Sequence, residues 1–65
     1  MTKEAIRIEA IQQAAEYRER AAKYEALAAE AKERGDIQMS IDFASKAAEE
    51  LGEARRIERA FATPL

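Results

Sequence analysis

The side chains best suited to ligand chemistry are basic and lie near the two ends of this 65-residue chain. They are Lys3, Arg7, Arg55, Arg56 and Arg59. Clustered guanidinium and ammonium groups bind phosphates, so a fold that joins the two ends would create a candidate nucleic-acid site. Glu9, Glu53 and Glu58 dilute that charge, and no aromatic residue is interleaved to stack bases. An ordinary solvated surface is therefore the favoured interpretation.

Catalytic chemistry has little support in the sequence, which contains no His and no Cys. Ser40 and Ser45 have no imidazole to activate them, and no Gly-rich phosphate loop is present. The glutamates recur at spacings that favour i,i+4 ion pairs on a helix rather than a metal site. These pairs are Glu16–Arg20, Glu19–Lys23 and Glu30–Arg34. The sequence predicts a protein that is not an enzyme and has no catalytic, cofactor-binding or metal site.

Two helices are needed to position these residues. No Gly or Pro interrupts residues 2–34, which are rich in strong helix formers, and Thr2 is a plausible N-cap. We expect a helix over residues 3–34, a turn at Gly35–Asp36 and a second helix over residues 37–61. Gly52 is a candidate break in the second helix, although the apolar pattern keeps its phase across it. The predicted fold is a single all-α domain over residues 1–65, an antiparallel helical hairpin.

Apolar residues spaced alternately three and four apart predict how the helices pack. The two rows are Ala10, Ala14, Tyr17, Ala21, Tyr24, Ala28, Ala31 and Ser40, Ala44, Ala47, Leu51, Ala54, Glu58, Phe61. Folded about the turn, Tyr24 meets Ala47 and Ala21 meets Leu51, so large residues face small ones. Glu58 is the polar exception, and Arg18 lies where it could neutralise it.

A second column of alanines has no partner within the hairpin. Alanine pairs recur every seven residues, and only one member of each pair belongs to the row above. A chain this short buries little surface alone, so we expect a homodimer that forms an antiparallel four-helix bundle. The residues predicted for the dimer interface are Ile8, Ile11, Ala15, Ala22, Ala29, Ile41 and Ala48.

Four aromatic or thioether side chains are candidate partner contacts. Tyr17 and Tyr24 lie in the packing row, which favours a core role. Met39 and Phe43 lie outside that row and near the turn. They could form a contact patch for a partner or be part of the dimer core, and the sequence does not favour either.

Net charge and hydropathy narrow the range of functions. The formal net charge is −2, which gives no polybasic signal for nucleic acid or membrane. No apolar run is long enough to span a bilayer, and no signal peptide precedes the first helix. The expected location is the cytoplasm, with no membrane partner.

Residues 21–51 resemble a single tetratricopeptide repeat. Tyr24, Leu27 and Ala28 match its first helix, Ala47 the small residue of its second, and residues 35–37 its turn. Ser40 and Ala44 replace the usual alanine and aromatic residue, and the repeat proline is absent. This resemblance implies binding of a peptide or protein. In size and layout the chain also looks like the small helical-hairpin homodimers of the plasmid Rop type, which bind paired RNA loops.

The sequence therefore favours a small regulator or adaptor that binds another protein, such as an inhibitor encoded by a phage or mobile element. The partners expected are a second copy of the chain and a protein. The alternative is Rop-like RNA binding through the basic residues, with Arg7, Arg55, Arg56 and Arg59 as partner contacts. A third hypothesis is a structural piece of a larger assembly.

Overall fold

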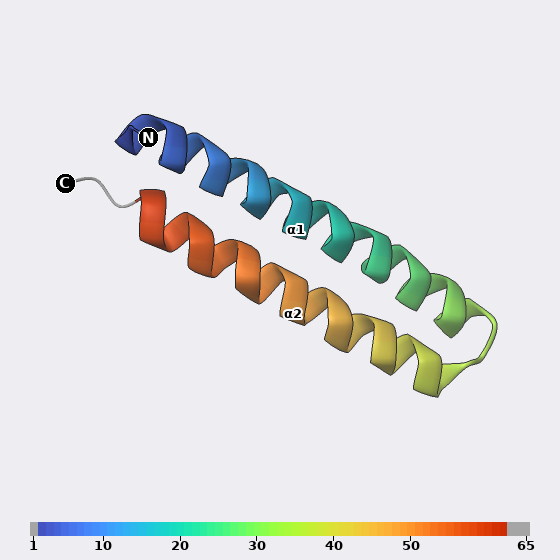
Figure 1. Ribbon diagram of the computed structural model, residues 1–65. Coiled ribbons are helices and arrows are strands. Elements are labelled where there is room, and N and C mark those ends of the chain that lie inside the picture. The colour runs from blue at the N-terminus through green and yellow to red at the C-terminus, as the bar shows by residue number, and fades with distance from the viewer. Residues whose placement is uncertain (1, 63–65) are drawn as a thin grey trace.

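The chain folds as two long antiparallel helices, which confirms the predicted all-α hairpin (Figure 1). The computed structural model describes residues 2–62. Helix α1 spans Lys3–Glu33 and helix α2 spans Ile37–Ala62. The start of α1 and the end of α2 lie together at one end of the hairpin, which we call the open end, and the turn lies at the other (Figure 1).

Helix α1 begins and ends with its backbone groups satisfied. The Thr2 hydroxyl Oγ1 accepts a hydrogen bond from the Ala5 N–H at 3.1 Å, as expected of an N-cap. Glu4 lies in the first turn and Lys32 in the last, where each charge interacts favourably with the helix dipole. The helix ends one residue earlier than predicted, because Arg34 is its C-cap.

Gly35 and Asp36 form the turn: both complete the end of α1, and Asp36 also begins α2. Gly35 has φ +81°, a left-handed conformation that glycine adopts without steric cost. Its N–H bonds to the Lys32 carbonyl at 3.0 Å, and the Asp36 N–H bonds to the Ala31 carbonyl at 2.9 Å. These two bonds form a Schellman motif. The Asp36 carboxylate Oδ1 then accepts a bond from the Met39 N–H at 3.2 Å, so Asp36 also caps α2.

Helix α2 runs without interruption through Gly52. A Cβ atom placed on Gly52 would meet nothing within 4 Å, so this glycine lies on an open surface rather than at a close contact. The helix continues to Ala62, one residue beyond the predicted end. The predicted stop at Thr63–Pro64 lies outside the described residues.

Among residues 2–62, every fully buried position between the helices is an alanine. Ala14, Ala21 and Ala54 are each no more than 1% exposed. The other buried apolar residues are Ala10, Ala28, Ala31 and Ala47. No larger side chain is fully buried within the described residues. Since a methyl group removes little apolar area from water, this hairpin gains close helix contact but limited hydrophobic stabilisation.

The seam of α2 differs from the predicted row at three places, one of which is Phe61: the row placed it in the seam, but it is 36% exposed. Phe43 lies in the seam, half-buried, and stacks on Tyr24 with 6.1 Å between ring centroids. Ala44, which the row placed in the seam, is exposed. The placement of Phe43 outside the row was therefore wrong. Ile57, also left outside that row, is half-buried.

Candidate protein-interaction surface

One side of the hairpin, the apolar flank, gathers most of the small and branched apolar residues left out of the seam; Ile6 and Leu27, 41% and 40% exposed, lie on the opposite side. A residue that follows a seam alanine by one or four positions lies on the same side of its helix. Ala15 and Ala22 follow seam alanines by one on α1, and Ala48 does so on α2. Arg18 and Glu58 each follow one by four, and they bond to each other. That bond places the two helix sides on one flank.

All seven residues predicted for a dimer interface lie exposed on this apolar flank. Its largest members are four isoleucines, each more than half exposed: Ile8 56%, Ile11 54%, Ile37 57% and Ile41 54%. Single exposed apolar residues are common, but several on one face commonly mark an interaction site. The structure therefore brings together residues from both helices that the sequence assigned helix by helix.

A bidentate ion pair is the main polar feature of the apolar flank. The Arg18 Nε and Nη2 atoms donate to the two carboxylate oxygens of Glu58, each at 2.6 Å. The hydrogen bond from Arg18 lowers the pKa of Glu58, and the same bond raises the pKa of Arg18. Both side chains are partly exposed, so the pair adds modest stability and mainly fixes the helix register. The predicted neutralisation of Glu58 is confirmed.

The opposite side, the polar flank, is defined by Gln13, Arg20, Lys46, Glu50 and Glu53, which precede seam alanines by one or four positions. Arg20 does not pair with Glu16 on its own helix. Its Nε lies 3.4 Å from a Glu50 carboxylate oxygen across the seam, and its guanidinium lies 4.6 Å from the centroid of the Tyr17 ring. The interhelix pair was missed because Arg20 was weighed only against Glu16 on its own helix.

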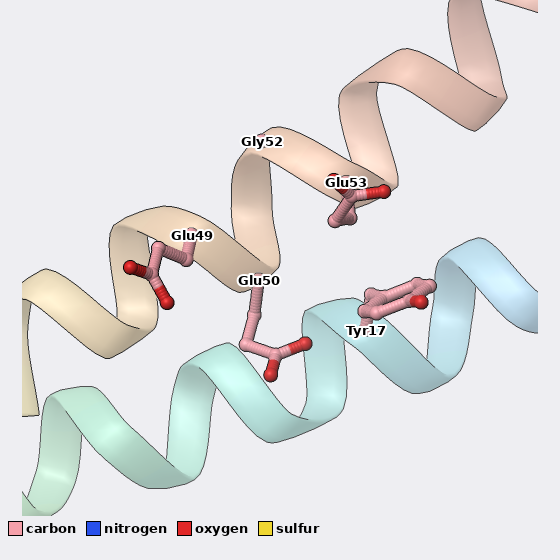
Figure 2. Close-up of a pocket in the computed structure, with 5 residues that line it drawn as sticks. All are labelled: Tyr17, Glu49, Glu50, Gly52 and Glu53. Carbon is pink, nitrogen blue, oxygen red and sulfur yellow. The ribbon is translucent and has the colours of Figure 1, made fainter.

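A shallow depression of about 360 Å³ opens on the polar flank. Figure 2 shows Tyr17 at its α1 side and, at its α2 side, Glu49, Glu50, Gly52 and Glu53. The missing side chain at Gly52 contributes to the space. Glu50 reaches toward α1 (Figure 2). Acidic residues beside one aromatic ring do not define a ligand, and we assign none.

The predicted basic cluster does gather at the open end, but acidic residues are interspersed with it. Arg56 Nη2 donates to Glu53 Oε1 at 2.6 Å, one helical turn away. Arg55 is close enough to Glu58 to lower the pKa of that carboxyl. Because of these interactions, part of the positive charge is already compensated within the chain.

The two candidate contacts near the turn have different environments. Met39 is 41% exposed, and its Sδ atom accepts a long contact from Arg34 Nη2 at 3.9 Å. Phe43 instead has its ring against Tyr24. Met39 is therefore available at the surface, whereas Phe43 is largely committed to the seam.

The described residues offer few other kinds of site. Within residues 2–62, no three Asp or Glu side chains are grouped so that they could hold a metal ion. Neither helix, over the same residues, has the length and apolar character needed to cross a membrane. Comparison with protein-family models, curated proteins and solved structures finds no match for this chain. The two flanks and the open end are therefore the surfaces on which a function can be sought.

Proposed function

We propose that this protein acts by binding another protein through its apolar flank, as a small regulator or adaptor without catalytic activity. The observation that carries the proposal is the set of four isoleucines, each more than half exposed, on one flank of a hairpin whose core contains only alanine. A chain with so little buried apolar area gains most when this flank is covered. Its location in the cytoplasm stays a prediction.

The matched pair Ile11→Glu and Gln13→Glu tests this proposal. The two residues are exposed on the same helix, but Ile11 is on the apolar flank and Gln13 on the polar flank. Each variant and the parent chain would be used to capture partners from an extract of the native host. We expect Ile11→Glu to lose the captured protein and Gln13→Glu to keep it. Equal capture by both variants would contradict a docking role for the apolar flank.

Nucleic-acid binding is the second candidate, because the hairpin brings Lys3 and Arg7 to the same end as the arginines of α2. The bond from Arg56 to Glu53 argues against it. The test is binding of a labelled RNA hairpin as salt is raised from about 50 to 200 mM, over which phosphate-led affinity falls steeply. The candidate requires that steep fall and its loss in an Arg55→Glu, Arg56→Glu double variant. The RNA-binding candidate fails if affinity is insensitive to salt.

A further inference from the structure

We infer that the apolar flank is covered by a second copy of this chain, lying antiparallel about a two-fold axis at Ala22. The inference deepens the proposed function, on which it rests, by naming the occupant of the flank and its orientation. Three features of the hairpin support it: the area of exposed surface, the order of residues along the flank and the distribution of charge.

The area available matches what a stable dimer needs. The chain exposes 5212 Å² of surface, whereas a compact protein of this mass exposes roughly 4,200 Å². The hairpin measures 49 × 16 × 13 Å, so its broad face is large for so short a chain. A face of that length and width is close to the roughly 800 Å² that each partner contributes to a standard interface. One flank therefore has room for a second hairpin.

The residues of the flank are ordered symmetrically about Ala22. Ala15 and Ala29 lie seven residues before and after it. The isoleucines of α1 lie about 15–20 Å from Ala22 toward the open end, taking 1.5 Å per residue. Because the chain reverses at the turn, Ile37 and Ile41 lie at about the same distance on the other side. A two-fold axis at Ala22 would place Ala15 of one copy against Ala29 of the other. It would also bring isoleucines to both ends of the interface.

Charge selects the antiparallel orientation. Arg18 lies four residues before Ala22 and Glu25 three residues after it, both toward the apolar flank. The two-fold axis sets Arg18 of each copy opposite Glu25 of the other, so the interface contains two such contacts. If α1 packed in parallel on α1 of the second copy, Arg18 would instead face Arg18 and Glu25 would face Glu25, which is unfavourable.

Arg18 and Glu25 each have hydrogen-bonding atoms available for this contact. Arg18 uses Nε and Nη2 for Glu58, which leaves the two N–H groups of Nη1. Glu25 is exposed and forms no ion pair with any described residue. Arg18 would then link Glu58 on its own chain to Glu25 of the second copy.

Single-cysteine variants test the orientation, since the natural chain has no Cys. Under mild oxidation, Ala22→Cys should cross-link to itself. Ala15→Cys and Ala29→Cys should cross-link when mixed but not separately. Gln13→Cys, on the polar flank, is the control and should form no cross-link. Cross-linking of Ala15→Cys and of Ala29→Cys each with itself would overturn the antiparallel orientation, because that pattern requires parallel hairpins.

Sedimentation at micromolar concentration tests the second copy itself. We expect a dimer that Glu25→Arg weakens about tenfold through two repelling contacts, whereas Glu25→Gln weakens it less. An unassociated parent chain would overturn the inference, as would unchanged affinity in Glu25→Arg. The proposed function can survive this failure: if the parent chain is monomeric but Ile11→Glu still loses a captured partner, the flank binds a different protein. Equal capture by Ile11→Glu and Gln13→Glu would instead overturn the proposed function itself.

Discussion

Two alanine columns run side by side along α1, and the hairpin uses them differently. Ala14, Ala21 and Ala28 lie against α2 and are at most 9% exposed. Ala15, Ala22 and Ala29, one residue further along, are exposed on the apolar flank. The columns have the same residue type, spacing and helix, and differ by about 100° of rotation. Composition therefore does not reveal what an alanine packs against, whereas its position relative to the turn does.

The largest expected effect comes from enlarging one residue in each column. Ala21→Leu adds three carbon atoms at a seam position that is only 1% exposed, so it should lower the free energy of unfolding by roughly 1–3 kcal/mol. Ala22→Leu adds the same atoms to an exposed site, and it should change that free energy by no more than about 0.5 kcal/mol. Urea denaturation at low protein concentration measures both. Equal losses in the two variants would erase the distinction between the columns.

A second test loosens the turn, which determines the column that faces α2. Gly35→Ala forces a side chain into a left-handed conformation and should destabilise the hairpin by roughly 1–2 kcal/mol. Gly52→Ala is the control: its site is helical and open, so it should stabilise the protein by roughly 0.5–1 kcal/mol. Thermal melts followed by circular dichroism would show the opposite shifts. A lower melting temperature in Gly52→Ala would mean that this surface is not open.

The smallest effect concerns the ion pair at the boundary between the seam and the apolar flank. The hydrogen bond from Arg18 lowers the pKa of Glu58, so the folded state favours the carboxylate. The stability from this pair is present above the ordinary glutamate pKa of about 4.3, and it is lost as the pH falls through the lower folded value. Glu58→Gln removes that term, so its stability should fall less than that of the parent chain between about pH 5 and pH 3. Identical pH profiles would show that the pair does not stabilise the register.

Much of the fold could be predicted because each local signal agreed with the next. Gly35 and Asp36 have the backbone and capping preferences that a tight turn needs, and the structure uses both. The seam alanines followed from their spacing. The Arg18–Glu58 pair followed from folding the two rows together about that turn. The gathering of the isoleucines of both helices on one flank required the observed interhelix contacts.

The row on α2 was wrong at Phe43 for a physical reason. Ser40 and Ala47 are seven residues apart. The seam residue between them can lie four residues after Ser40, at Ala44, or three residues after it, at Phe43, and spacing alone does not choose between the two. Packing decides: Phe43 removes far more apolar area from water than an alanine does, and it stacks on Tyr24. Spacing along one helix also failed to identify the ion-pair partner of Arg20. Arg20 is long enough to leave its own helix and reach Glu50.

The all-alanine core has a thermodynamic consequence. The heat capacity change of unfolding is proportional chiefly to the apolar area exposed, and an average 65-residue protein would show about 0.8–1 kcal/mol/K. Since only alanines are fully buried among the described residues and the larger seam residues are half-buried, the isolated hairpin should fall below that range. Its free energy of unfolding would then depend only weakly on temperature, and cooling would reduce that free energy only slightly. Calorimetry could measure this curvature directly, and covering the four isoleucines would sharpen it.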